Sequence, residues 1–202
     1  MDRLEGLAKL TGAERYLDDE PMPGCLWGMT VRSPAPRGIV RGLRFDPSID
    51  WLRLVVVDHR DIPGPNQTYL IENDQPVLAP IGGETRHMHE AIALVAGDDR
   101  DLVRRAVASV SVDVEPLPAV LDYRLPPRRE QIQRGDDNVI KRLAIRKGDV
   151  RAAMAQAAHV VEGVYETGAQ EHVYIENQAM AAWFEGDVVV VRGSMQCPYY
   201  VL

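Results

Sequence analysis

The sequence predicts an α+β fold, and three observations support this. Short apolar runs with period-two alternation or many β-branched residues recur between residues 26 and 115. A single segment with apolar residues at helical spacing interrupts them at residues 100–109. Helices therefore do not alternate regularly with strands, as they do in α/β proteins with a parallel sheet.

The strands expected before this helix are bounded by turn-forming residues. Pro34 and Pro36 separate the first two, and residues 62–66, with two prolines and a glycine, close the third. The fourth is short and fully apolar. The predicted strands cover residues 26–31, 39–45, 51–57 and 92–96.

The helix predicted at residues 100–109 has both a start signal and an apolar stripe. Asp98 and Asp99 precede it, and an aspartate side chain accepts hydrogen bonds from the free N–H groups of a first helical turn. A strand is expected to follow at residues 110–115, where a proline-rich turn ends it. The stripe consists of Leu102, Val103, Ala106, Val107 and Val110.

The periodic sequence patterns are interrupted in the second half of the chain. Residues 126–147 show no periodicity and predict an extended linker or a segment that wraps a partner surface. The expected domains are therefore 1–125, a linker at 126–147, and an incomplete second domain at 148–202. In that last part we expect an alanine-rich helix at 149–158 and strands at 159–167, 173–184 and 188–192.

The last strand leads into a polar motif, Gly193-Ser194-Met195-Gln196-Cys197, close to the final residue of the sequence. A strand that ends in polar residues is usually followed by a loop or helix that completes a functional site. We therefore expect the chain to be the front portion of a larger protein.

Composition excludes several classes of function. The 202 residues include 30 acidic and 23 basic side chains, a formal net charge of −7. This excess argues against nucleic acid as a partner, because phosphate binding requires a basic surface. No apolar run approaches the roughly 20 residues that span a bilayer, so no membrane partner is expected.

The cysteine usage and the N-terminus predict a reduced, cytoplasmic protein. The charged first residues lack the apolar core of a signal peptide. Cys25 and Cys197 lie far apart and form no paired-cysteine metal motif. Two cysteines also cannot supply the four thiolates of an iron–sulfur cluster.

Two clusters of titratable residues are candidate sites. His87 and His89 would share one side of a strand, where metal ligation is an option, but no third ligand is nearby and a polar strand end is favoured. Glu171 and His172, with Glu176, offer an acid–base pair. On a strand the first two face opposite sides, so a hydrogen-bonded structural role is favoured. No metal ligand is predicted in this chain.

Motifs in a fixed order along nearly the whole chain carry a family resemblance. They are residues 9–16, Arg32-Ser33-Pro34, 58–66, 91–96, 112–122, Gly148-Asp149-Val150, 159–165, 170–176 and Ser194-Met195-Gln196. The ordered set resembles the molybdenum hydroxylases, the group of xanthine dehydrogenase and aldehyde oxidase. Residues 1–125 resemble its α/β hammerhead domain, and 148–202 the first strands of its molybdopterin-binding domain. His89 stands where the family usually has glycine.

The resemblance implies an oxidoreductase that hydroxylates a purine-like heterocycle or an aldehyde with oxygen from water. Molybdopterin is implied as the cofactor of the complete enzyme, with iron–sulfur clusters and FAD on other segments or subunits. The implied partners are the remainder of the molybdopterin-binding subunit, the iron–sulfur and FAD subunits or domains, and a second copy in a homo-oligomer. No cofactor is expected on this chain alone, which we expect to be inactive in isolation.

The resemblance also implies one site residue. Gln196 matches the family glutamine at a strand end that hydrogen-bonds an oxygen ligand of molybdenum, a task suited to a neutral amide. The alternative is a glutamine that caps a following helix. Gln170 and Glu176 are expected to stabilise the cofactor domain. The family's catalytic glutamate and glycine-rich Phe-Gly loop have no counterpart in this sequence.

Two other functions remain open at this point. One is a non-catalytic docking module of a multi-subunit complex, which would use residues 126–147 as its contact surface. The other is a chaperone-like or regulatory relative that kept the fold and lost the site. Gln196 favours the enzyme, because a module without a site has no need of it.

Overall fold

The computed structural model describes residues 5–68 and 73–196. No helix within these ranges is long and apolar enough to cross a membrane. The α-helices are α1 Gly6–Thr11, α2 Arg100–Ser109 and α3 Val150–Gln156. The strands are β1 Trp27–Arg32, β2 Gly38–Arg44, β3 Leu54–Asp58, β4 Glu84–Thr85, β5 Ala91–Gly97, β6 Ser111–Pro116, β7 Met180–Glu185 and β8 Val188–Gly193. Short 3₁₀ helices are η1 Leu17–Asp19, η2 Trp51–Arg53, η3 His59–Asp61 and η4 Arg129–Gln131.

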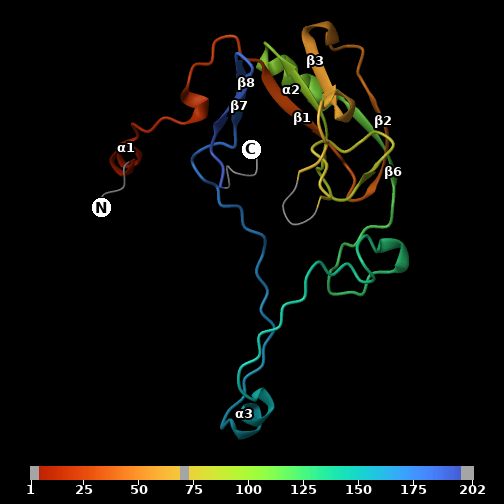
Figure 1. Ribbon diagram of the computed structural model, residues 1–202, viewed down its shortest axis with the longest axis vertical. Coiled ribbons are helices and arrows are strands. Elements are labelled where there is room, and N and C mark those ends of the chain that lie inside the picture. Colours follow the sequence, from red (N-terminus) through yellow and green to blue (C-terminus); the bar gives the residue numbers. More distant parts are fainter. Residues whose placement is uncertain (1–4, 69–72, 197–202) are drawn as a thin grey trace.

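Two antiparallel three-stranded sheets form the first part of the molecule, which we call the two-sheet region (residues 27–116; Figure 1). One sheet has the order β1-β5-β3 and the other β4-β2-β6. Helix α2 contacts β1 and β5. The predicted α+β class is confirmed, because strands dominate and α2 is the one α-helix among the described residues of this region.

The core follows from the alternation of side chains along the strands. Val31 of β1 and Val95 of β5 face α2, where they pack with Ala93 and Ala106. Ile92 points the other way and packs with Val40 and Ala79 beside the second sheet. The strand β5 therefore contributes to both core clusters, which explains why it is the most completely apolar of the predicted strands.

Helix α2 has the predicted bounds and the predicted cap. The Asp99 carboxylate accepts hydrogen bonds from the backbone N–H groups of Asp101 and Leu102, at 2.9 and 3.0 Å. The bond from the Leu102 N–H lowers the pKa of Asp99. Leu102, Val103 and Ala106 are buried, so the predicted apolar stripe faces the sheet.

Local departures from the predicted strands have local causes. Residues 51–53 form η2 instead of the start of β3. The Trp51 indole donates to the Asp46 carbonyl at 2.7 Å and packs edge-on against Phe45, which holds that turn in place. Other short elements, among them α1, η4 and the two-residue β4, were not predicted, because they are too short to show a periodic pattern.

The prediction of strands at 159–167 and 173–184 is wrong for most of that length. Residues 157–179 contain no strand, and β7 begins only at Met180. A strand requires a hydrogen-bonded neighbour, and in the described part of the chain β7 and β8 pair only with each other. Residues 139–175 are exposed throughout, as the chain runs out to α3 and back (Figure 1).

Part of the segment predicted as a linker folds back onto the two-sheet region, and Arg37 holds it there. The Arg37 guanidinium pairs with Glu84 at 2.7 Å and donates to the carbonyls of Pro118 and Glu130 at 2.8 and 2.7 Å. Gln131 adds a bond from its amide to the Ala119 carbonyl at 2.6 Å. One nearly buried cation thus joins β2, β4, the end of β6 and η4.

Arg37→Ala is expected to lower the free energy of unfolding by about 3 kcal/mol, because it leaves the Glu84 carboxylate and two carbonyls without their donor. Arg41→Ala, on the strand β2 that begins directly after Arg37, is the matched control. Arg41 pairs with Glu115, both side chains are more than half exposed, and such pairs contribute at most about 1 kcal/mol. Denaturant unfolding followed by tryptophan fluorescence measures both. Equal losses would contradict the role given to Arg37.

Candidate functional site

The predicted site residue, Gln196, lies at a bend just beyond the β7–β8 hairpin and is exposed. The hairpin ladder runs from Glu185 opposite Val188 to Met180 opposite Gly193. A two-residue turn with Gly186 at a φ of +63° joins the strands, as short hairpin turns require. The structure therefore places Gln196 three residues after the last paired position.

Gly193 allows the two strands to approach closely at the open end of the hairpin. A Cβ atom on Gly193 would overlap Met180 Sδ and lie 2.7 Å from the Ala179 carbonyl oxygen. The second contact is with backbone, which cannot move aside as a side chain can. Any other residue at this position would push β8 off β7 and displace the segment that carries Gln196.

Polar contacts hold the same end of the hairpin. The Ser194 hydroxyl donates to the Glu176 carboxylate at 2.7 Å. The Asn177 amide donates to Asp18 at 2.8 Å. Arg192 lies 3.7 Å from the Glu20 carboxylate. Residues from the N-terminal part and from the stretch before β7 therefore meet at the open end of the hairpin, shortly before Gln196 in the chain.

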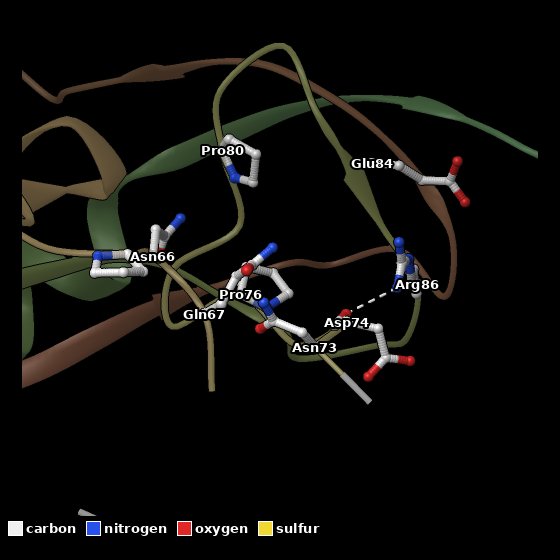
Figure 2. A pocket seen from close by; sticks show the side chains of 9 residues that line it. Asn66, Gln67, Asn73, Asp74, Pro76, Pro80, Glu84 and Arg86 are labelled. Atoms are coloured by element: carbon white, nitrogen blue, oxygen red, sulfur yellow. Dashed lines mark hydrogen bonds between the residues drawn. The ribbon is translucent and has the colours of Figure 1, made fainter. Parts of the chain in front are cut away.

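A cavity of about 490 Å³ lies on the two-sheet region (Figure 2). Three prolines, Pro65, Pro76 and Pro80, give it rigid walls, and the Arg86 guanidinium donates to the Asp74 carbonyl at 2.8 Å. A second cavity, of about 370 Å³, is lined by Arg37, Arg86 and His87 among others. Gln196 is not among the described residues that line either one.

Several polar groups around these cavities are already engaged. Arg37 pairs with Glu84, and Arg134 pairs with Asp74. Asn66, from the 58–66 motif, uses its side-chain amide on the backbone of Leu78, at 2.7 and 3.0 Å. These residues serve the fold, because their polar groups have partners within the protein.

The described residues bring no third candidate metal ligand together with His87 and His89. Within that part of the chain, no group of three or more His, Cys, Asp or Glu side chains is placed to hold a metal ion. The His87 imidazole Nδ1 lies 2.9 Å from the Met88 carbonyl oxygen. Cys25 is exposed and free, and Cys197 falls outside the described residues.

His89 adopts a backbone conformation typical of the glycine that it replaces in the family pattern. Its φ is +67°, in the left-handed region that glycine tolerates best. The His89 N–H donates to the Ser33 carbonyl at 2.9 Å. The His89 carbonyl accepts from the Arg32 guanidinium, also at 2.9 Å. Both backbone groups are thus engaged, and the conformation is set by the surrounding structure.

Asp58 caps η3 and is nearly buried. Its carboxylate accepts from the Arg60 backbone N–H at 2.8 Å and from the Arg60 guanidinium. The bond from the Arg60 side chain lowers the pKa of Asp58 below its ordinary value, against burial, which acts to raise it. The folded state therefore favours the ionised carboxylate.

Glu171 and His172 are not arranged as an acid–base pair through their side chains. The Glu171 carboxylate accepts from the backbone N–H of His172 at 3.1 Å. Glu176 is instead bonded to Ser194. No sequence pattern predicted that contact, since it joins residues 18 positions apart.

Comparison with known proteins identifies the class of the chain. Residues 11–118 match the family model for the aldehyde oxidase and xanthine dehydrogenase a/b hammerhead domain. Residues 132–202 match the molybdopterin cofactor-binding domain. The chain belongs to the aldehyde oxidase and xanthine dehydrogenase family. The resemblance drawn from the sequence motifs, and the hammerhead fold it implied, are confirmed.

Individual relatives agree with this assignment. The chain is 29% identical over 202 residues to the nicotinate dehydrogenase large molybdopterin subunit of Eubacterium barkeri, covering 98% of this chain and 47% of that protein. It is 28% identical over 211 residues to the xanthine dehydrogenase molybdenum-binding subunit of Escherichia coli O157:H7, covering 98% of this chain and 28% of that protein. The chain thus spans about half or less of the length of these relatives.

Solved structures show the same fold. Aldehyde oxidoreductase from Desulfovibrio gigas superposes with a TM-score of 0.70 over 94% of this chain and 22% of that one, at 24% identity. CO dehydrogenase from Oligotropha carboxidovorans gives 0.53 over 65% of this chain and 16% of that one, at 25% identity. The first match extends beyond the two-sheet region, so the second part of the chain also follows a known arrangement.

Removal of the side chain at the left-handed position is expected to stabilise the protein. His89→Gly should raise the free energy of unfolding by about 0.5 kcal/mol, since removal of the Cβ strain outweighs the added flexibility of the unfolded chain. His87→Gly is the control, because His87 does not have a positive φ, so the change adds flexibility to the unfolded chain without relieving backbone strain. Thermal unfolding of the two variants should shift in opposite directions. A loss of stability in His89→Gly would refute the strain at this position.

Asp58→Asn is expected to cost about 1.5–3 kcal/mol of unfolding free energy at pH 7, the usual contribution of a hydrogen bond to a charged group. Because the folded-state pKa is lowered, this contribution is complete above the unfolded pKa and disappears as pH falls through the folded pKa. The difference between wild type and variant should thus be constant near neutrality and shrink below about pH 4. Urea unfolding across that range measures it, and a difference independent of pH would exclude the ionised pair.

Proposed function

We propose that this chain is the hammerhead portion and the first part of the cofactor domain of a molybdenum-dependent hydroxylase that acts on a purine-like heterocycle or an aldehyde. The observation that carries the proposal is the order of the two family matches, 11–118 and then 132–202, with Gln196 inside the second. Relatives named for xanthine and nicotinate dehydrogenase support a heterocyclic substrate. We propose the domain limits 1–125 and 148–202, joined by 126–147.

Gln196 suits a place beside the molybdenum cofactor. Its side chain is exposed, and within the described residues no hydrogen bond engages its amide. A neutral amide donates to an oxygen ligand without adding charge next to a metal. When bound, the molybdenum cofactor supplies the oxygen-transfer and electron chemistry of hydroxylation. Gln196 would orient and polarise one oxygen ligand there, while Gly193 lets β8 deliver it.

The wider assembly is part of the same proposal. Molybdopterin is the cofactor of the whole protein, and the iron–sulfur clusters and FAD belong to other segments or subunits. The partners are the rest of the molybdopterin-binding subunit, the subunits or domains that carry those electron carriers, and a second copy of the protein. On this proposal the chain alone is inactive, and the cytoplasm is its place of action.

The alternative of a non-catalytic docking module loses part of its proposed surface. It requires residues 126–147 to be available to a partner, yet η4 within this segment is bonded to Arg37 and Ala119 of the same chain. Arg134 is paired with Asp74. These contacts occupy the first half of the segment and favour the enzyme over the module.

In the cofactor-loaded enzyme that contains this chain, Gln196→Ala is expected to lower kcat by about 10–100-fold, the usual effect of losing a group that orients a metal ligand. The electron paramagnetic resonance signal of pentavalent molybdenum should shift, with the metal content unchanged. Gln178→Ala is the control, since Gln178 is also an exposed amide near the hairpin. This variant should change neither kcat nor the resonance signal.

Two results would contradict the proposal in different ways. If the complete protein that contains this chain, purified with its partner subunits, holds no molybdenum and has no hydroxylase activity, the proposed enzyme is refuted. A loaded enzyme whose signal and kcat are untouched by Gln196→Ala would refute the role of Gln196 alone.

A further inference from the structure

The segment that carries Gln196 is not held by the β-ladder. The last hydrogen-bonded pair of the hairpin is Met180 with Gly193, and Ser194, Met195 and Gln196 lie beyond it. Residues beyond the last pair of an isolated hairpin fray readily. A side chain that must meet a metal ligand within a fraction of an ångström needs a further constraint.

The Glu176–Ser194 hydrogen bond supplies such a constraint. Its oxygen atoms are 2.7 Å apart, the spacing of a bond between a hydroxyl and a carboxylate. Glu176 is half-buried, whereas nearly all residues from 139 to 178 are exposed. It precedes β7 by four residues, so the bond joins the two arms of the hairpin just past the end of the ladder.

Two contacts from the N-terminal part brace the same place. Asn177, next to Glu176, donates to Asp18 of η1 across 159 positions of sequence. Arg192, two residues before Ser194, faces Glu20 at 3.7 Å. Exposed ion pairs of this length contribute little individually. Their value here is that they tie both arms of the hairpin to one short segment, residues 18–20.

We propose that Glu176 is a positioning residue for Gln196: through the Ser194 hydroxyl it holds the strand end that presents Gln196, and residues 18–20 brace that end. The inference rests on the proposed function for the role of Gln196, but not for the bond itself. Glu176 acts only through Ser194 and touches no reacting atom.

The bond is tested in this chain by hydrogen exchange of the backbone amides at the open end of the ladder, in the pairs Met180–Gly193 and Ala181–Arg192. Glu176→Ala and Ser194→Ala should each speed exchange about fivefold, the equivalent of one lost hydrogen bond. The double variant should be no faster than either single one, because both remove the same contact. Glu176→Gln and Ser194→Thr keep an acceptor and a donor and should stay close to wild type.

Matched controls distinguish a specific effect on the strand end that carries Gln196 from a general loss of stability. Glu171→Ala removes an exposed carboxylate of the same stretch whose bond is to the adjacent His172 N–H, and it should leave this exchange unchanged. The amides of α2 should also be unaffected in every variant. Additive effects in the double variant, or equal effects from Glu171→Ala, would overturn the proposal.

The consequence for the site is measured in the cofactor-loaded enzyme. Glu176→Ala should shift the molybdenum resonance in the same direction as Gln196→Ala and lower kcat more than it changes KM, and Glu176→Gln should restore both. If exchange speeds up as expected but Gln196→Ala leaves the signal unchanged, the proposed function fails while the bond stands. If Gln196→Ala shifts the signal and Glu176→Ala does not, the positioning role is overturned alone.

Discussion

Much of the order in this molecule depends on how the guanidinium of Arg37 is satisfied. It lies nearly buried just before β2, where it pairs with Glu84 of β4 and donates to the carbonyls of Pro118 and Glu130. A buried cation is costly unless it is paired and fully hydrogen-bonded. That requirement brings the short strand β4, the exit of β6 and the turn η4 together at one point.

Gly38, the residue after Arg37, allows these segments to come together. A Cβ on Gly38 would overlap Val114 Cγ1 and lie 2.7 Å from the Glu115 carbonyl oxygen. The glycine lets β2 and β6 approach closely, and Arg37 then reaches the Pro118 carbonyl just past the end of β6. Arg37 also binds the Glu130 carbonyl, so it holds η4 against the two-sheet region.

The hairpin that carries Gln196 is organised differently. It has no buried core residue of its own in the described structure, and both of its strands have exposed apolar side chains, among them Phe184 of β7 and Val189 of β8. Close backbone approach at Gly193 defines its open end, together with polar contacts to residues 18–20 and to Glu176. The two-sheet region is thus held by burial, and the candidate site by contacts between segments far apart in sequence.

Local chemistry in the sequence determined most of the elements and the family. The strands β1, β2, β5, β6 and β8 and the helices α2 and α3 lie within a few residues of their predicted places, because periodicity and caps act within short windows. The ordered motifs also marked Gln196 at a strand end, where the structure places it; its role beside a metal stays a prediction.

Only the tertiary structure decided the rest. Residues 159–167 remain unpaired because a strand needs a neighbour, and the left-handed His89, the Arg37 junction and the Glu176–Ser194 bond each depend on partners distant in sequence.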